Sequence, residues 1–582
     1  MTFIRVAEKF KKILTKEQKR YVVLLFLMMV IAGFMEMLSV SLMLPFVKAV
    51  MNPEDIMQNS FVNEICGWFN IFDGRSFLVS LSFVMAGIYL LKNIYLLFQI
   101  AVQNRFVNQT LFLTQRKLLN SFLHKPYESF LKIQSGEVLR IIGTDTVSAF
   151  GILTHMLNLV TELVVTITLL VTVVVISPIL TMGMGALLAF LILGIQGIIR
   201  PVLKRAGENH QSALAGMNKW MIQSVQGIKE IKIMASENYF LQNFEREGKI
   251  YVNSTYKQMT LGAVPKYLIE ALTMGTFFIV VAFQFLRGAD ADSVVPIISV
   301  IAMAAIRLLP AASRISGCMA GITFGEPAVD KLIENLHYSD METEKAYAGG
   351  NDTVETSIQF EKSIDLVNIQ YKYPTGERNI LNGAGLSIEK GTSIGIVGAS
   401  GSGKTTAVDL ILGLLTPNLG IVTVDGVDIH NGYKNWISQI GYIPQSIFLL
   451  DSDIRENVAF GVPPEEIDDD KVWHALEEAA LDDHVRSLPD GINTEIGERG
   501  IRLSGGQRQR LGIARALYFD PEVIVFDEAT SALDNDTEIA IMESIDHLQG
   551  SKTLIIIAHR LSTIENCDAV YCVEDGKIVR QR

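Results

Sequence analysis

The chain has few cysteines, and their spacing argues against a metal site or a disulfide framework. Its 582 residues include only Cys66, Cys318, Cys567 and Cys572, and no two of them form a Cys-x-x-Cys pair. Structural zinc sites use closely paired cysteines and histidines, and disulfide scaffolds need many cysteines in an oxidising compartment. We therefore interpret all four as ordinary thiols.

Positive charge is also in short supply. Asp and Glu outnumber Lys and Arg by 62 to 50, the net charge is −12, and no basic segment interleaves with aromatic residues. A nucleic-acid-binding protein has to neutralise phosphates with a basic surface, so the composition argues against such a partner. A cleavable signal peptide is not evident either, because the first apolar run is too long for one. No peptidase segment precedes that run, which argues against peptide export with leader cleavage.

Long apolar runs, in contrast, fill the first 325 residues. Six stretches are long enough to span a bilayer, at about 21–47, 77–101, 150–176, 179–200, 264–286 and 294–318. Lys and Arg cluster before the first stretch and after the second, whereas the connection between them carries Glu54 and Asp55. By the positive-inside rule, both chain ends and the two long connections, 102–149 and 201–263, are predicted to be cytoplasmic.

The two long connections have helical patterns and no core of their own. We therefore expect the spans to continue beyond the membrane into the cytoplasm. Residues 227–237, between two such extensions, are the predicted position of a coupling helix that contacts the cytoplasmic domain.

Several ionisable residues lie in or near the predicted spans, where each costs about 2.5–3.5 kcal/mol at the bilayer centre. One interpretation is pairing between helices, or snorkelling near span ends. The other is a polar cavity in which four cations meet an anionic substrate, namely Lys92, Lys266, Arg307 and Arg314. Both interpretations remain open for the whole set, which consists of Glu36, Lys92, Glu162, Lys266, Glu270, Arg307 and Arg314.

The composition changes to that of a soluble α/β domain near residue 358. We therefore predict a membrane domain at 1–325, a linker at 326–357 that begins as a helix, and a nucleotide-binding domain at 358–582. Alternating patterns at 364–373 and 421–427 indicate an antiparallel portion. Continuous apolar runs at 393–397, 523–526 and 553–557 indicate buried parallel strands.

A phosphate-binding loop follows the run at 393–397. A strand, a glycine-rich turn and a helix N-terminus in that order direct backbone N–H groups and the helix dipole at an anion. Lys404 is predicted to reach the outer phosphates of ATP, and Thr405 to ligate Mg²⁺. The predicted ATP-binding residues of this loop are Gly398, Ala399, Ser400, Gly401, Ser402, Gly403, Lys404, Thr405 and Thr406.

Two acidic residues end the run at 523–526. Asp527 at the strand tip is placed to hold Mg²⁺ through water, and Glu528 is placed to polarise the attacking water as a general base.

Upstream of these acids lies Leu503-Ser504-Gly505-Gly506-Gln507. This stretch closely resembles the signature LSGGQ of the ATP-binding cassette family. The resemblance implies that two cassettes sandwich two ATP molecules, each held between one subunit's phosphate loop and the Ser504, Gly505, Gly506 and Gln507 of the other.

The same resemblance implies roles for four further residues. Tyr373 corresponds to the aromatic residue that stacks on adenine, with Tyr371 an alternative beside it. Gln445 corresponds to the glutamine that senses Mg²⁺ and water, Asp534 belongs to a loop that links the two sites, and His559 corresponds to the histidine that contacts the γ-phosphate.

Six spans followed by one cassette resemble the exporter-type half-transporters, over essentially the whole chain. The fold expected is an α-helical six-span membrane domain followed by an α/β P-loop cassette. No catalytic element is degenerate, so a homodimer with two competent sites is expected rather than a heterodimer. The protein is expected in the bacterial inner membrane, with its cassette in the cytoplasm.

The cargo is a separate question, because a fold does not fix it. Within the family, the membrane half most resembles the flippases of lipid-linked oligosaccharides in bacterial protein N-glycosylation, at Glu36–Phe46, Ala263–Glu270 and Arg307–Ile315. This likeness implies a polyprenyl-pyrophosphate glycan as cargo. The alternatives are a general lipid or multidrug exporter and, from a different class, an ATP-gated regulatory subunit that moves nothing.

Overall fold

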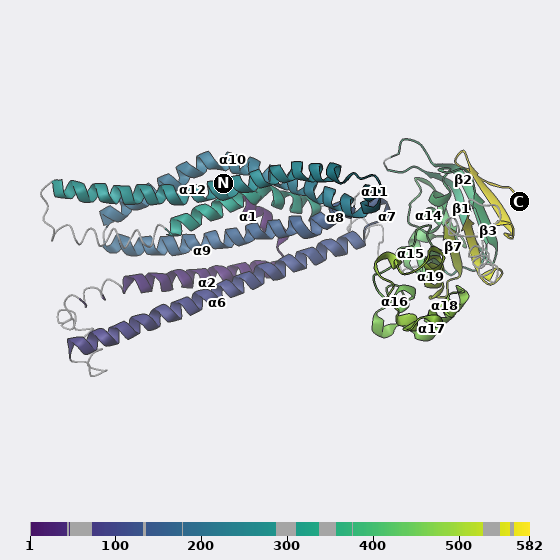
Figure 1. The fold of residues 1–582 in the computed structure, drawn as a ribbon, viewed down its shortest axis with the longest axis horizontal. Coiled ribbons are helices and arrows are strands. Elements are labelled where there is room, and N and C mark those ends of the chain that lie inside the picture. The colour runs from purple at the N-terminus through teal and green to yellow at the C-terminus, as the bar shows by residue number, and fades with distance from the viewer. Residues whose placement is uncertain are drawn as a thin grey trace. The chain divides into compact units, whose positions relative to one another are not determined.

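The computed structural model describes residues 2–42, 46, 50, 73–131, 135–176, 178–286, 310–336, 357–374, 376–527, 548–558 and 564–582. The chain divides into two compact units, of which the first comprises Met1–His124 with Ile133–Glu344 and the second comprises Lys125–Lys132 with Lys345–Arg582. The first unit is helical, and the second contains all of the described strands (Figure 1).

Long helices make up the first unit. They are α1 (Thr2–Ile13), α2 (Lys16–Ser41), α6 (Gly74–Leu123), α8 (Ser135–Arg140), α9 (Thr146–Ile176), α10 (Pro178–Gln226), α11 (Ile228–Ile233), α12 (Glu237–Leu286) and a last helix at 310–336, with a π-helical turn at Ile141–Asp145. Within the described residues, α2, α6 and a segment that includes most of α9 are long and apolar enough to cross a membrane. The predicted spans 179–200 and 264–286 lie inside α10 and α12. The sixth, 294–318, is described only from residue 310.

Three helices are long enough for the expected extension of the spans beyond the membrane. Helices α6, α10 and α12 contain 50, 49 and 50 residues. At 1.5 Å per residue each is about 75 Å long, whereas the hydrocarbon core of a bilayer is about 30 Å thick. Helices α10 and α12 run side by side over much of their length (Figure 1).

The basic helix α1 packs onto the last helix of the unit. The ring of Phe10 meets Phe150 of α9 edge-on, with 6.1 Å between centroids. Arg5 and Lys9 both pair with Glu326, whose side chain is buried in the helix at 310–336. Residues 326–336, which the sequence assigns to the start of a linker, therefore continue the helix that includes residue 310 and belong to the first unit.

Two sheets form the framework of the second unit. An antiparallel sheet has the order β2-β1-β4-β5, and a mixed sheet has the order β10-β9-β3-β8-β7-β6, parallel except for β10. The strands are β1 (Ser363–Tyr371), β2 (Leu381–Glu389), β3 (Ser393–Val397), β4 (Leu419–Val424), β5 (Val427–Asp428), β6 (Ile440–Ile443), β7 (Val523–Asp527), β8 (Thr553–Ile557), β9 (Ala569–Glu574) and β10 (Lys577–Arg580).

Both predictions for the strands are confirmed. The alternating segments lie in the antiparallel pair β1 and β4, and the continuous apolar runs are β3, β7 and β8. Along β7, Val523 and Val525 join the core on one face of the sheet, whereas Ile524 and Phe526 join the core on the other. A parallel strand that is buried on both faces has to be apolar at every position, which explains the uninterrupted runs.

Short helices cover this framework. They are α7 (Tyr127–Phe130), α14 (Lys404–Ile411), α15 (Tyr433–Ile437), α16 (Ile454–Val458), α17 (Asp469–Glu478), α18 (Asp482–Ser487) and α19 (Gly505–Leu517). The carboxyl ends of β3, β7 and β6 lie at one edge of the sheet, where ligands of open parallel sheets bind. At this edge, β3 leads into the glycine-rich loop, β7 ends at Asp527, and β6 ends two residues before Gln445.

Trp436 on α15 is the largest fully buried side chain of the chain's described part. Its Nε1 donates to the carbonyl oxygen of Ile411 at 2.8 Å, and its ring meets Phe360 edge-on. Replacing Trp436 with Ala leaves a cavity and an unpaired carbonyl, so we expect the cassette to lose about 3–5 kcal/mol of unfolding free energy. Chemical denaturation followed by cassette fluorescence measures this. Lys434→Ala, exposed on the same helix, is the matched control, and equal losses in both variants would contradict the packing argument.

Candidate nucleotide site and membrane cavity

The loop between β3 and α14 has the shape of a phosphate cradle. Gly398, Gly401 and Gly403 all have positive φ, at 147°, 77° and 108°. A Cβ at Gly398 would lie 2.5 Å from the carbonyl oxygen of Val573, so no side chain fits there. Helix α14 begins directly at Lys404, with Gly403 as its N-cap. Backbone N–H groups and a helix N-terminus are therefore presented together, as an anion site requires.

Lys404 and Ser402 have side chains suited to phosphate. The Lys404 ammonium is buried and donates to the carbonyl oxygens of Gly398 and Ala399 at 3.0 and 3.2 Å, so it folds back over its own loop. The Ser402 hydroxyl is buried and has no hydrogen-bond partner in the described part of the chain. A bound phosphate would supply acceptors to both groups, so these residues fit ATP.

The two tyrosines before the loop have different surroundings. Tyr371 is buried, whereas Tyr373 is half-buried and its hydroxyl hydrogen-bonds Thr406 Oγ1 at 3.0 Å. Their rings meet edge-on, 5.2 Å apart. Tyr371 packs in the core, so Tyr373 is the less buried of the two tyrosines, and its hydroxyl contacts α14.

Asp527 at the end of β7 belongs to a buried acidic group. It is 6% exposed, and Oδ2 accepts a hydrogen bond from Tyr442 on β6 at 3.3 Å. Burial, reinforced by the Asp527 carboxylate, raises the pKa of Asp409 on α14 to about 6. Burial, with Asp527 and Asp409 adding to it, also raises the pKa of Tyr442 above its usual value. This concentration of negative charge beside the cradle fits a divalent cation.

The other predicted Mg²⁺ residues lie at the surface. Thr405 is exposed at the start of α14, and Gln445 is exposed two residues after β6. Together with Asp527 they offer hydroxyl, amide and carboxylate oxygens, the donor types that Mg²⁺ takes. Three of the predicted site residues, Glu528, Asp534 and His559, lie outside the described residues.

The signature stretch starts α19 through reciprocal caps. Ser504 Oγ accepts from the Gln507 backbone N–H at 3.2 Å, and Gln507 Oε1 accepts from the Ser504 N–H at 2.8 Å. This capping box explains why a serine precedes Gln507 by three residues. Ser504 and Gly505 are exposed, and a Cβ at Gly505 meets no atom within 4 Å. The stretch therefore presents a helix N-terminus with an open surface.

A short helix that the sequence analysis missed belongs to the same unit. Residues 125–132, from the connection between α6 and α9, group with the cassette and contain α7. Glu128 Oε1 accepts hydrogen bonds from Tyr371 Oη at 3.2 Å and from the Thr416 N–H at 3.1 Å. Pro126 was the available signal, because a proline ends one helix and starts another. At the predicted coupling position, 227–237, the structure has α11.

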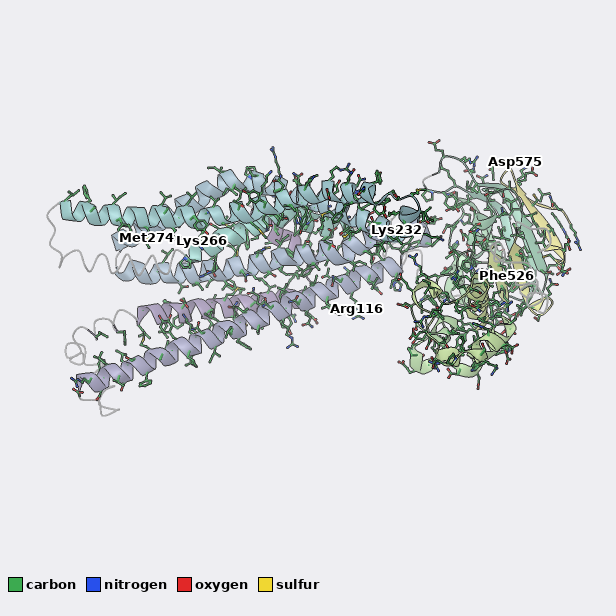
Figure 2. The ribbon with its side chains drawn as sticks, in the orientation of Figure 1. Arg116, Lys232, Lys266, Met274, Phe526 and Asp575 are labelled. Atoms are coloured by element: carbon green, nitrogen blue, oxygen red, sulfur yellow. The ribbon has the colours of Figure 1, made fainter. Side chains whose placement is uncertain are left out.

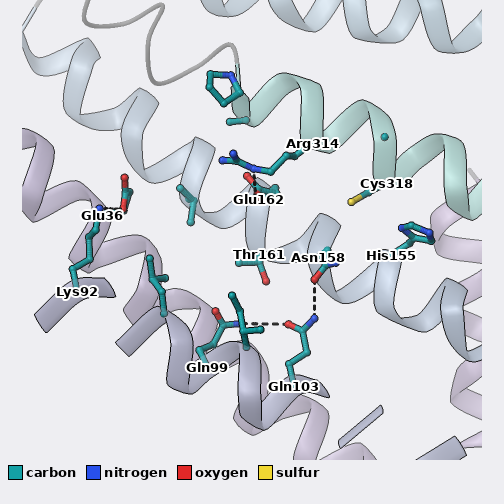
Figure 3. Close-up of a pocket in the computed structure, with 16 residues that line it drawn as sticks. Glu36, Lys92, Gln99, Gln103, His155, Asn158, Thr161, Glu162, Arg314 and Cys318 are labelled. Carbon is teal, nitrogen blue, oxygen red and sulfur yellow. Dashed lines mark hydrogen bonds and ion pairs between the residues drawn. The ribbon is translucent and has the colours of Figure 1, made fainter. Parts of the chain in front are cut away.

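A cavity of about 840 Å³ with both apolar and charged residues in its lining lies in the first unit (Figure 3). Lys92 and Arg314 line it, and each has an acidic partner: Lys92 Nζ lies 2.7 Å from Glu36 Oε2, and Arg314 Nε lies 2.5 Å from Glu162 Oε1. Lys266 does not line this cavity and is exposed on α12 (Figure 2). The fourth predicted cation, Arg307, lies outside the described residues.

These features define the class of protein, a P-loop nucleotide-binding cassette that continues a membrane domain of long helices. The model of the ABC transporter transmembrane region matches residues 22–302, and the ABC transporter cassette model matches residues 381–531. The chain therefore belongs to the ABC transporter family, as an exporter-type half-transporter with fused membrane and ATPase domains.

Relatives in the family carry several different names. The chain is 32% identical to the heterocyst differentiation ATP-binding protein HepA of Nostoc sp. over 62% of its length, and 31% identical to an ATP-dependent lipid A-core flippase of Saccharophagus degradans over 66%. These matches cover 58% of HepA and 64% of the flippase. It is 32% identical to the leukotoxin translocation protein LktB of Mannheimia haemolytica over 70% of this chain and 56% of that protein. The chain thus spans little more than half the length of several of the relatives it matches.

A solved structure agrees in fold over nearly the whole chain. It is that of a bacterial Atm1-family ABC exporter with ATP bound, which covers 96% of this chain and 94% of its own, with a TM-score of 0.68 and 20% identity. The predicted fold, a helical membrane domain followed by an α/β ATP-binding cassette, is confirmed.

Asp409 gives the cassette a defined pH dependence. Burial raises its pKa to about 6, above the usual range of a carboxyl group, so ionisation in the folded state is unfavourable. Wild-type stability should therefore fall as pH rises from about 4 to 6, a loss of roughly 1–3 kcal/mol that Asp409→Asn avoids. Thermal unfolding of both proteins between pH 4 and 7 measures it. The variant's advantage should appear only above about pH 4 and level off above pH 6; a difference independent of pH would contradict this.

The Glu128 contact predicts a local effect on α7. Glu128→Ala removes the acceptor of two hydrogen bonds, so amide hydrogen exchange in residues 125–132 should accelerate at least about fivefold, the effect of losing roughly 1 kcal/mol. Glu128→Gln, which keeps a carbonyl oxygen there, should exchange more slowly than the Ala variant. Exchange in β3 and β7 is the internal control. Unchanged exchange at 125–132 in Glu128→Ala would show that this carboxylate does not hold α7.

Proposed function

We propose that the protein is an ATP-driven exporter that acts as a homodimer. The observation that carries this proposal is one chain with a membrane domain, a phosphate cradle and an exposed signature helix. The signature presents a helix N-terminus for phosphate, although the cradle of the same chain already has its own. In the proposed homodimer, the open surface at Gly505 of one chain faces the ATP held in the phosphate cradle of the second chain.

The assignment of roles in hydrolysis follows from residue chemistry and position. Lys404 and the loop N–H groups hold the phosphates, Tyr373 stacks on adenine, and Glu528 orients water as the general base. Mg²⁺, when bound, neutralises phosphate charge, and Thr405, Gln445 and Asp527 are the residues that would hold it. His559 contacts the γ-phosphate, and Asp534 communicates with the second site, as the family resemblance implies.

For the cargo we propose a polyprenyl-pyrophosphate-linked oligosaccharide, flipped across the bacterial inner membrane for protein glycosylation. The resemblance of three membrane-domain stretches to the lipid-linked oligosaccharide flippase PglK supports it. Two relatives with a lipid A-core flippase name, one of them 27% identical over 81% of this chain, are further support. Lys92 and Arg314 in one cavity, with Lys266 and Arg307 as further candidates, are the proposed pyrophosphate contacts.

The carboxylate partners of the two cavity cations affect how an anion binds there. Glu36 and Glu162 neutralise Lys92 and Arg314, so a pyrophosphate has to displace or share these carboxylates. Arg314 is 56% exposed, which leaves part of its guanidinium available to a ligand. Lys92 is only 7% exposed, so its ammonium is less accessible.

The charge pairing also favours a second candidate function, a general lipid or multidrug exporter. A cavity with two cations and two carboxylates carries no net charge from these four groups, and it therefore tolerates amphiphiles that are not anionic. Such an exporter would hydrolyse ATP faster in the presence of many unrelated amphiphiles, whereas the flippase responds to its lipid.

The experiment that tests the proposal is translocation of a labelled polyprenyl-pyrophosphate oligosaccharide in proteoliposomes. We expect ATP-dependent movement by the wild type. Glu528→Gln should abolish it and lower ATP turnover at least about 100-fold, because the general base is lost. Near-normal turnover in Glu528→Gln would refute the role of Glu528. No lipid movement alongside ATPase activity stimulated by other amphiphiles would move the function to the general exporter.

A further inference from the structure

A chain of amide side chains lies along the wall of the membrane cavity. Gln99 Nε2 on α6 donates to Gln103 Oε1 at 3.3 Å, and Gln103 Nε2 donates to Asn158 Oδ1 on α9 at 2.7 Å. Figure 3 shows the two hydrogen bonds, which meet at Gln103 and connect α6 to α9. Gln99 and Gln103 are 2% and 3% exposed, in a part of α6 that is otherwise rich in exposed Leu, Ile and Phe.

The spacing of the cavity residues explains how both helices present polar groups to one place. Positions three or four residues apart lie on one face of a helix. The cavity residues of α6 follow this spacing, as do those of α9: Lys92, Leu96, Gln99 and Gln103 on the former, and His155, Asn158, Glu162 and Val165 on the latter.

The amide chain retains hydrogen-bonding capacity at both ends. Among the described residues, Gln99 Oε1 and Asn158 Nδ2 make no hydrogen bond, and Asn158 is exposed to the cavity. One turn from Asn158, Glu162 Oε2 is a buried acceptor that likewise lacks a partner there. Polar groups placed in a membrane domain need partners, because leaving them unpaired away from water costs free energy.

We propose that the amide chain Gln99–Gln103–Asn158 is a subsite for the hydroxyl groups of the cargo's glycan. A carboxamide both donates and accepts, as a sugar hydroxyl does, and it carries no charge that would favour an ion instead. The ion pairs Lys92–Glu36 and Arg314–Glu162 line the same cavity, so one lipid headgroup reaches amides and cations together. This inference rests on the proposed flippase function and specifies which residues meet the sugar.

The test compares two lipids that differ only in the glycan. The full-length homodimer in nanodiscs is titrated with a polyprenyl pyrophosphate that carries an oligosaccharide and with the same polyprenyl pyrophosphate without sugar. The readout is the lipid concentration that gives half-maximal stimulation of ATP hydrolysis. Asn158→Leu should raise this concentration at least about tenfold for the glycan-bearing lipid, through loss of hydrogen bonds, and leave it nearly unchanged for the glycan-free lipid.

Two further variants separate recognition from packing. Gln99→Met removes a carbonyl oxygen that makes no hydrogen bond among the described residues, but it leaves the Gln103–Asn158 bond between α6 and α9 intact. It should therefore give the same selective loss even if Asn158→Leu fails to fold. Thr161→Val is the matched control, because Thr161 lines the cavity but its hydroxyl donates to Leu157 O within its own helix at 3.0 Å. It should respond like the wild type to both lipids.

Each other outcome overturns the inference. In Gln99→Met, the half-maximal concentration could rise equally for both lipids or for neither. Either result would mean that the amides only hold the helices or bind water. If the wild type responds equally to both lipids, the glycan subsite is refuted and the proposed flippase function still stands. If the wild type responds to neither lipid, both the glycan subsite and the proposed flippase function are refuted.

Discussion

The close approach of two backbone segments at the start of the phosphate cradle constrains the whole cassette. Gly398 lies so near the carbonyl oxygen of Val573 in β9 that no Cβ fits between them. The loop is therefore fixed against the strand beside β3, and α14 begins at a set position with Lys404 as its first residue. The order of the sheet then places β7 and β6 so that Asp527 and Gln445 follow strands ending at the same edge.

A second constraint concerns a short segment of the chain that belongs to the cassette unit although it lies between two membrane-domain helices in sequence. Residues 125–132 come from the connection between two membrane-domain helices, yet they belong to the cassette unit. Glu128 there bonds to Tyr371, and Tyr371 packs against Tyr373, the proposed adenine residue. Glu128, Tyr371 and Tyr373 therefore form a continuous set of contacts from α7 to the proposed nucleotide site.

Charge in the membrane helices is balanced locally. Lys92 with Glu36 and Arg314 with Glu162 pair across different helices, so interhelical pairing applies to these four residues, and the same four line one cavity. Pairing lowers the cost of each charge in a low-dielectric surrounding, and the cavity keeps Arg314 partly open. Gln99, Gln103 and Asn158 line the same cavity and add polar groups without adding charge.

The sequence by itself determined the local elements. The glycine-rich turn before Lys404, the capping box at Ser504 and the uninterrupted run Val523–Phe526 each specify a structure from residues close in the chain, so their positions could be predicted. Tertiary structure alone decided which distant side chains meet. Glu128 joins Tyr371 across 243 positions, and Glu162 joins Arg314 across 152. Helical periodicity shows which face a residue occupies, but the neighbouring face depends on how the helices pack, and that is where pairing and the cavity arise.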